Sequence, residues 1–157
     1  MTYARFTVAY GCLLVAALLP FACAVLAKWG RVGVSTRQGG YDNNNPRDWL
    51  ARQTDWRARA NHAQANTFEA LPFFFAAVII AHQLQAFQVR LDVFAFVFVV
   101  LRIAYIIMYV ADMAKSRSVL WFLALLVNIG ILFLGYRYRL VTVLRHPTHR
   151  SVQTRTG

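Results

Sequence analysis

Three polar residues, Asn66, Thr67 and Glu69, interrupt the apolar run from Ala65 to Ala81 in the segment QANTFEALPFFFAAVIIAHQ (residues 64–83). A glutamate such as Glu69 is costly inside an apolar segment unless another group compensates its charge. In a helix Glu69 shares one face with Asn66, and the same face extends back to His62 and Arg59 at intervals of three and four residues. Arg59 and His62 alone are also compatible with capping the helix near the lipid headgroups. Glu69 therefore predicts a charged partner or a bound ligand.

A matching face occurs later in the chain, in the segment RIAYIIMYVAD. Arg102, Tyr105, Tyr109 and Asp112 follow one another at intervals of three, four and three residues, which places them on one side of a helix. An arginine this deep in an apolar segment faces the interior or a wet cavity and pairs with an anion. An ion pair with Glu69 or Asp112 would balance its charge, but two phenols exceed what one ion pair requires. The two faces predict a site for a small polar molecule that has both amino and carboxylate groups.

The chain that carries these faces has the composition of a membrane protein. Of its 157 residues, 59% are hydrophobic, and 17 Lys and Arg residues stand against 6 Asp and Glu residues. A soluble domain would expose more Glu and Lys and would not repeat apolar runs of about 20 residues. The basic residues lie between these runs and in the tail, without the stripe of aromatic residues typical of a nucleic-acid surface. We therefore expect contact with anionic membrane lipids and no nucleic-acid partner.

Four apolar runs are long enough to cross a membrane. The expected spans are residues 6–27, 65–82, 93–113 and 119–136. Short charged links after the second and third spans make neighbouring helices antiparallel. The predicted fold is therefore all-α, an integral membrane bundle of four transmembrane helices in up-down order, formed by a single domain over residues 1–157.

The remaining segments are polar. Residues 28–63 form a long loop whose GG and DNNNPRDW sequences indicate turns, and we expect a helical lead-in to the second span at its end. The excess of Lys and Arg in the first and third loops favours a cytoplasmic location for them. Residues 137–157 form a basic tail, in which His146 and His149 are too isolated to predict a metal site.

The first apolar run resembles a signal peptide only superficially. It is longer than the apolar region of a signal peptide and no clear cleavage site follows it, so we expect a retained span. Its two cysteines, Cys12 and Cys23, lie about three helical turns apart, which is too far for a disulfide between them. They are expected to be packing residues.

The two polar faces resemble motifs of the MAPEG family, the membrane-associated proteins in eicosanoid and glutathione metabolism. The run RANHAQANTFEALPFFFAA (residues 59–77) matches in its Arg, Asn, Glu and Pro spacing, and R-x2-Y-x3-Y follows in the third span with a basic residue after it. The resemblance covers nearly the whole chain, including the long first loop. It implies a left-handed four-helix bundle that assembles as a homotrimer and binds glutathione between adjacent subunits. It also implies a bacterial-type member, with several spans in the bacterial inner membrane.

The resemblance carries over to individual residues. It implies that glutathione, as co-substrate, contacts Asn66 and Glu69 in the second span and Arg102, Tyr105 and Tyr109 in the third. Arg59 and His62 share the face of Asn66 and are expected to bind it too, although several family members have an arginine at the position of His62. Arg117 is the best match to the arginine that stabilises the glutathione thiolate in catalytic members, and Lys115 is the alternative.

Two functions are compatible with these residues. The first is a glutathione-dependent membrane transferase or peroxidase that activates the thiol against lipophilic electrophiles from the bilayer. The second is a non-catalytic lipid-binding or scaffold protein with the same fold. Arg117 distinguishes them, because a binding protein needs no thiolate stabiliser. A transporter is not favoured, since the sequence has no inverted repeat or pair of broken helices.

Overall fold

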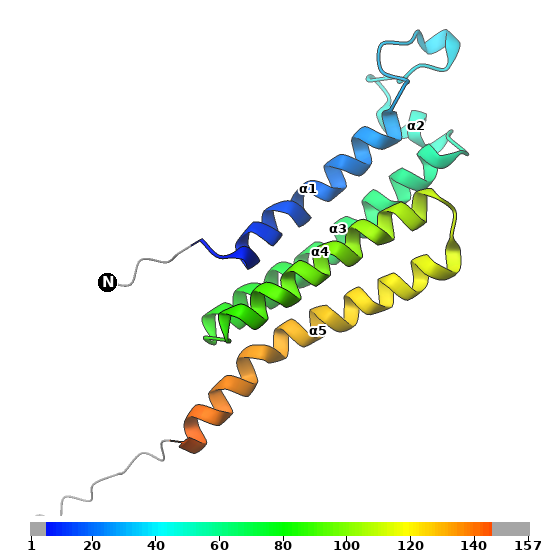
Figure 1. The fold of residues 1–157 in the computed structure, drawn as a ribbon. Coiled ribbons are helices and arrows are strands. Elements are labelled where there is room, and N and C mark those ends of the chain that lie inside the picture. The colour runs from blue at the N-terminus through cyan, green and yellow to red at the C-terminus, as the bar shows by residue number, and fades with distance from the viewer. Residues whose placement is uncertain (1–5, 146–157) are drawn as a thin grey trace, which may run out of the picture.

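The protein is a bundle of four long helices, as the computed structural model shows (Figure 1). The structure describes the backbone of residues 6–145 and the side chains of residues 6–136. The long helices are α1 (Val8–Lys28), α3 (Trp56–Gln83), α4 (Gln88–Val110) and α5 (Ala114–Arg145). Each is long and apolar enough to cross a membrane. The prediction of an all-α, four-helix membrane bundle is confirmed.

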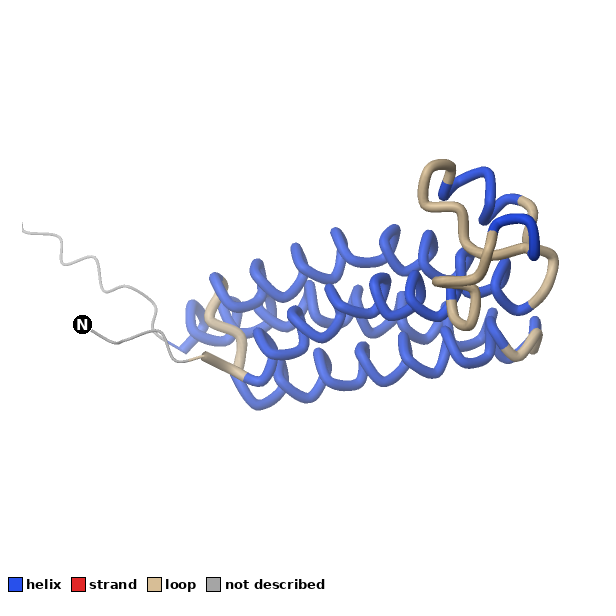
Figure 2. The backbone as a smooth tube through the Cα atoms, turned by 90° about the horizontal axis from the view of Figure 1, so that it is seen from above, coloured by secondary structure: helices blue, strands red, loops and turns tan. Residues whose placement is uncertain are grey.

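The helices α3 and α4 form the centre of the bundle. α1 and α5 each pack against both of them, and successive helices run in opposite directions (Figures 1 and 2). Phe74 of α3 stacks on Phe98 of α4 with ring centroids 4.0 Å apart. Alanines let the backbones approach closely, as small residues do in membrane bundles; those buried along α3 are Ala60, Ala63, Ala77 and Ala81. Both polar faces predicted from the sequence therefore belong to the two central helices.

The connection between α1 and α3 lies beyond one end of the bundle (Figure 1). It contains a 3-10 turn, η1 (Thr36–Gln38), and a short helix, α2 (Pro46–Ala51). Gly40 is required there, because a Cβ atom would lie 1.9 Å from the carbonyl oxygen of Val34. The ring of Trp49, which is 5% exposed, meets the ring of Tyr41 edge to face. The expected loop is thus folded on itself.

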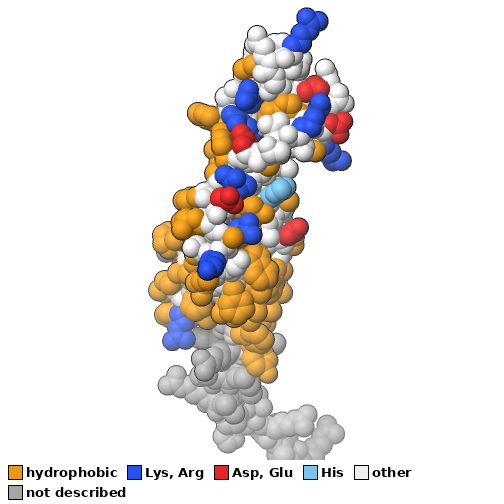
Figure 3. Space-filling model, turned by 90° about the vertical axis from the view of Figure 1, so that its right-hand side faces the viewer, with side chains coloured by type: hydrophobic (Ala, Val, Ile, Leu, Met, Phe, Trp, Pro, Cys, Tyr) orange, Lys and Arg blue, Asp and Glu red, His pale blue; other side chains and the backbone are white. Residues whose placement is uncertain are grey.

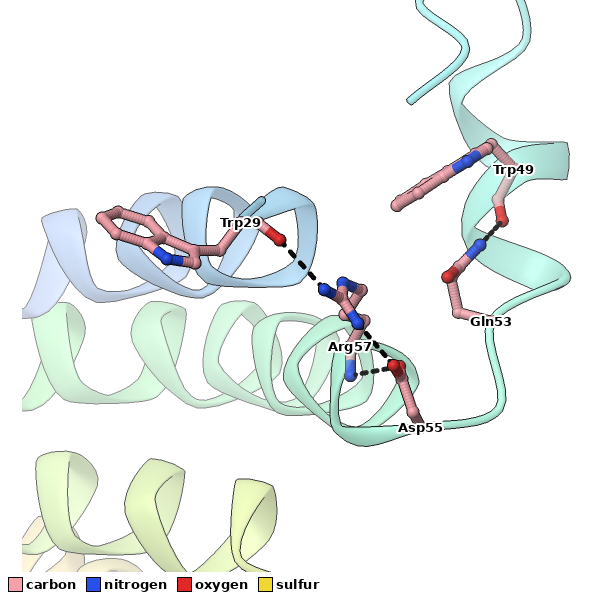
Figure 4. Close-up of polar contacts among 5 residues, drawn as sticks. All are labelled: Trp29, Trp49, Gln53, Asp55 and Arg57. Carbon is pink, nitrogen blue, oxygen red and sulfur yellow. Dashed lines mark hydrogen bonds and ion pairs between the residues drawn. The ribbon is translucent and has the colours of Figure 1, made fainter. Parts of the chain in front are cut away.

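Arg57 joins this connection to the bundle (Figure 4). Its Nη2 donates to the carbonyl oxygen of Trp29 just after α1, at 3.2 Å, and its Nη1 lies 2.5 Å from Asp55 Oδ2. Asp55 also accepts the backbone N–H of Arg57 at 2.9 Å and so caps the start of α3. This cap explains why α3 begins at Trp56, before the span expected from residue 65, and it accounts for the expected helical lead-in.

The third and fourth helices also differ from the expected spans. α4 ends at Val110 and not near residue 113, because Asp112 takes a left-handed conformation with φ of 63°. α5 begins at Ala114, so the expected link at residues 114–118 is its first turn. α5 continues to Arg145, beyond the expected end at residue 136, so the first part of the predicted basic tail has a helical backbone. His146 and His149 lie outside the described residues.

The surface agrees with a membrane location. On the face drawn in Figure 3, hydrophobic side chains cover the side of the bundle, and charged side chains gather toward the end that carries the connection. Large apolar side chains face outward from every long helix, for example Leu18, Ile79, Phe96 and Phe122. Cys12 and Cys23 are buried free thiols of α1, as expected for packing residues. The protein is therefore a multi-pass integral membrane protein.

Candidate functional site

Arg102 is the centre of the polar network between α3 and α4. Its side chain is 1% exposed, and its Nη2 donates to Thr67 Oγ1 at 2.9 Å and to Asn66 Oδ1 at 3.2 Å. The guanidinium also lies over the ring of Tyr105, 4.3 Å from its centroid. The Thr67 hydroxyl in turn donates to the carbonyl oxygen of Ala63 at 2.7 Å. Neutral oxygens and an aromatic face thus hold this buried cation.

Glu69 is not the ion-pair partner of Arg102. In the part of the chain that the structure describes, the ion pairs are Arg57 with Asp55 and Arg59 with Asp112. The carboxylate of Glu69 receives only a long contact of 3.5 Å from the amide nitrogen of Asn66. Asn66 therefore links the two charges, and the Glu69 carboxylate retains capacity to bind a further donor.

The two predicted tyrosines extend the network toward the end of the bundle that carries the long connection. Tyr105 and Tyr109 meet edge to face with centroids 5.6 Å apart, and His62 of α3 approaches Tyr109 at 6.5 Å. The Arg117 guanidinium lies 4.3 Å from the centroid of Tyr109. Lys115 is exposed.

Arg117 reaches Tyr109 by a route that the sequence did not predict. We expected it to lie beyond the end of the third span, but it belongs to the first turn of α5. The chain reverses at Asp112 and Met113, and this reversal returns Arg117 over α4. Two helices therefore position Arg117 against Tyr109.

Arg59 is already engaged by the end of α4. Its Nε donates to the carbonyl oxygen of Val110 at 2.9 Å, and its Nη1 lies 3.7 Å from Asp112 Oδ2. The carbonyl is one of those left without a helical partner at the end of α4. Asp112 lies past α4 and so does not share the helical face of Tyr109, contrary to the expected periodicity. Arg59 thus joins the mouth of the network to the turn before α5.

A cavity of about 190 Å³ adjoins the network between α3, α4 and α5. Its polar lining residues are Asn66, Glu69, Arg102 and Asn128, and its other walls are Ala70, Phe73, Phe98, Trp121, Ala124 and Leu125. Sequence reasoning missed Asn128, which is 2% exposed. The sequence does contain a signal for it, because an asparagine inside the apolar run at 119–136 needs a hydrogen-bond partner there.

The structure thus brings the predicted residues together as one continuous network. It runs from Glu69 through Asn66 to Arg102, and on through Tyr105 and Tyr109, where Arg117 and His62 approach from either side; Arg59 lies next to its mouth. No cluster of three His, Cys, Asp or Glu side chains that would hold a metal occurs within the described residues. The network offers donors and acceptors for an organic ligand.

Comparison with known proteins confirms the family resemblance of the sequence. The model of the MAPEG family matches residues 8–136, which include all four apolar helices and every residue of the network. Comparisons with curated proteins and with solved structures give no match. On the family match, the chain belongs to the MAPEG family of membrane proteins, with a general role in glutathione or eicosanoid metabolism.

Proposed function

We propose that the protein is a glutathione-dependent membrane transferase or peroxidase that acts on lipophilic electrophiles. The observation that carries this proposal is the position of the Arg117 guanidinium, 4.3 Å from the ring of Tyr109 at the end of a network of ligand-binding groups. An arginine needed only for headgroup contact would extend away from the bundle. Arg117 instead lies partly buried beside groups that suit a peptide ligand.

The network matches the chemistry of glutathione. Glu69 accepts hydrogen bonds from the ligand's ammonium group, while Arg102 and the phenols of Tyr105 and Tyr109 donate to its carboxylates and carbonyls. Charge-assisted bonds of this kind are strengthened in surroundings of low dielectric constant.

Arg117 supplies the catalytic charge. A thiol has a pKa of about 8.5, so a neighbouring cation is needed to ionise it at neutral pH. With a carbon electrophile, the thiolate sulfur forms the C–S bond and the thiol proton passes to the product or to a leaving group. With a hydroperoxide, the thiolate attacks the terminal oxygen, the O–O bond breaks to release an alcohol, and a second glutathione converts the sulfenic acid to disulfide and water.

Assembly as a homotrimer fits the position of Glu69. The residue lies halfway along α3 and is exposed on the surface of one protomer, where a carboxylate would otherwise face lipid. A neighbouring subunit together with glutathione would cover it, so we propose that the binding site lies at a subunit interface. Native mass spectrometry in mild detergent tests this assembly, and a protein found only as a monomer would contradict it.

The thiolate itself provides the test of function. Addition of glutathione to the purified protein should produce the ultraviolet absorbance of a thiolate, together with turnover of a generic electrophile such as a chlorodinitrobenzene. The Arg117→Ala variant should still bind glutathione but lose this absorbance, and its turnover should fall by about 10²–10³, as for the loss of one preorganised charge.

Lys115→Ala is the matched control, because Lys115 is exposed in the same helical turn. It should keep both the absorbance and most of the turnover. A parent protein that binds glutathione without any glutathione-dependent rate, or an Arg117→Ala variant as active as the parent, would favour the alternative of a non-catalytic lipid-binding protein.

A further inference from the structure

Two buried polar atoms in the central cavity have no hydrogen-bond partner. They are Arg102 Nε, a donor, and Asn128 Oδ1, an acceptor, and both side chains line the cavity between α3, α4 and α5. An unsatisfied buried polar group costs about 1–3 kcal/mol. Such groups are rare among the residues of native proteins and indicate a missing water, ion or ligand. A ligand that accepts from Arg102 and donates to Asn128 would satisfy both atoms.

The charged side chains that line the cavity indicate which chemical groups such a ligand would carry. Glu69 adds a carboxylate with only one long contact, from the amide nitrogen of Asn66. Because the lining contains the cation of Arg102 and the anion of Glu69, it favours a ligand that carries both an anionic and a cationic group. An α-amino-acid group does so, since its carboxylate accepts from the guanidinium of Arg102 and its ammonium donates to Glu69 and to Asn128 Oδ1.

We propose that Asn128 of α5 is a further binding residue of the glutathione site, and that its Oδ1 accepts from the ammonium group of the γ-glutamyl end. This inference rests on the proposed function. It adds a residue halfway along α5 to a site to which that helix otherwise contributes Arg117 in its first turn. It also makes Asn128 a specificity-determining residue, because a thiol without the free γ-glutamyl ammonium cannot use its acceptor.

The size and position of the cavity fit one end of the tripeptide. Its volume of about 190 Å³ is below the roughly 300 Å³ of the smallest pockets that hold a whole drug-sized ligand. The remainder of glutathione must therefore extend out of it. From Arg102 to Tyr109 the helix rises about 10 Å. The γ-glutamyl α-carbon and the cysteine sulfur lie roughly 9 Å apart when extended, so the sulfur comes near Arg117.

A lipid hydroxyl is a weaker candidate for this cavity. It would satisfy the unpaired atoms of Asn128 and Arg102, but a neutral hydroxyl would not compensate the negative charge of Glu69. Trp121 and Phe73 do give the cavity apolar walls, so the experiment is designed to detect a lipid ligand as well.

The experiment compares two ligands on two proteins. The ligands are glutathione and glutaryl-cysteinylglycine, which differ only in the ammonium group. The proteins are the parent and Asn128→Leu, in lipid nanodiscs, with binding measured by calorimetry. We expect Asn128→Leu to weaken glutathione binding by roughly ten- to a hundredfold, the range for a lost hydrogen bond to a charged group, and to leave binding of the analogue within about twofold.

Leu125→Ala is the control, because Leu125 lines the same cavity without a polar atom. It should change the affinities for both ligands by the same factor. An equal loss of both ligands in Asn128→Leu, or a change in its oligomeric state, would show that Asn128 acts through packing and would overturn the proposal. An unchanged glutathione affinity with a raised KM for the electrophile would overturn it in favour of a lipid ligand. A parent that binds neither ligand would reject the proposed function itself, and the inference with it.

Discussion

Two carboxylates lie within the membrane helices, and their surroundings differ. Asp92 of α4 accepts the backbone N–H of Ala9 at 2.8 Å and the side-chain amide of Gln88 at 2.8 Å. Glu69 of α3 has only the 3.5 Å contact with Asn66. The bonds of Asp92 satisfy a free N–H at the start of α1 and join α4 to that helix. The carboxylate of Asp92 is satisfied and stabilises the bundle, whereas the unsatisfied carboxylate of Glu69 belongs to the proposed binding site.

The strongest test of this difference is the removal of the charge of Glu69. Glu69→Gln should weaken glutathione binding by about 1.5–3 kcal/mol, because a charge-assisted hydrogen bond to the ammonium group is lost. The bundle should remain folded, since Glu69 holds no ion pair with Arg102 that the change would break. Calorimetric titration and thermal unfolding in detergent measure the two effects. A variant that aggregates or unfolds at a lower temperature, with no defect specific to glutathione, would show that Glu69 has a structural role instead.

The opposite result is expected at the other carboxylate. Asp92→Ala should lower the free energy of unfolding by about 1–2 kcal/mol, as for the loss of a cap at a helix N-terminus. Glutathione affinity should stay within about twofold, because Asp92 lies near the end of the bundle opposite Tyr109. Gln88→Ala is the control, since it removes one partner of Asp92 and leaves the bond to Ala9 intact. A large loss of glutathione binding in Asp92→Ala would contradict this prediction, because it would show that Asp92 also supports the binding site.

Thr67 extends this comparison, because it is a buried residue of the bundle that also orients Arg102 of the proposed site. Its hydroxyl, fully buried, accepts from Arg102 and donates to the Ala63 carbonyl. Thr67→Val keeps the shape but removes the acceptor, so glutathione binding should weaken by about 1 kcal/mol as Arg102 loses its fixed orientation. Thr67→Ser should restore binding. Loss of stability in Thr67→Val with unchanged affinity would show that Asn66 alone is sufficient to position Arg102.

The sequence predicts the helical faces better than it predicts how they meet. Periodicity places Arg102, Tyr105 and Tyr109 on one side of α4, because that relation is local and set by 3.6 residues per turn. The relative position of α3 and α4 depends on packing at sites such as Phe74 and Phe98, so the pairing of Arg102 with Asn66 could not be predicted.

Turns and single polar residues account for the other differences. The left-handed conformation of Asp112 ends α4 before the expected residue, and the sequence has no proline or glycine at 110–114 that would predict this end. That turn moves Arg117 onto α5. Asn128 could not be predicted from periodicity, because it is a lone amide in an apolar helix, although its burial requires a hydrogen-bond partner. The residues of the proposed site could thus be grouped from the sequence where several of them shared one helical face.

Asp55 gives the smallest expected effect, and it tests a satisfied carboxylate outside the membrane. Partial burial opposes its ionisation, but the hydrogen bonds and the charge of Arg57 outweigh this, so the pKa of Asp55 lies below its ordinary value of 3.8. A pKa that is lower in the folded state adds stability above pH 3.8, and this stability is lost as the pH falls through the folded pKa. Because the side chain is 44% exposed, solvent screening limits the contribution.

Asp55→Asn keeps a good N-cap and removes only the charge. At neutral pH the variant should be less stable than the parent by under about 1 kcal/mol, the range for an exposed ion pair. The difference should shrink in thermal unfolding curves as the pH falls below about 4, where the parent's carboxylate becomes protonated. Glutathione affinity should not change, since Arg57 and Asp55 join the connection to α1 and lie outside the network around Arg102. A stability difference that is independent of pH would mean that Asp55 stabilises α3 through its geometry as a cap, with no contribution from its charge.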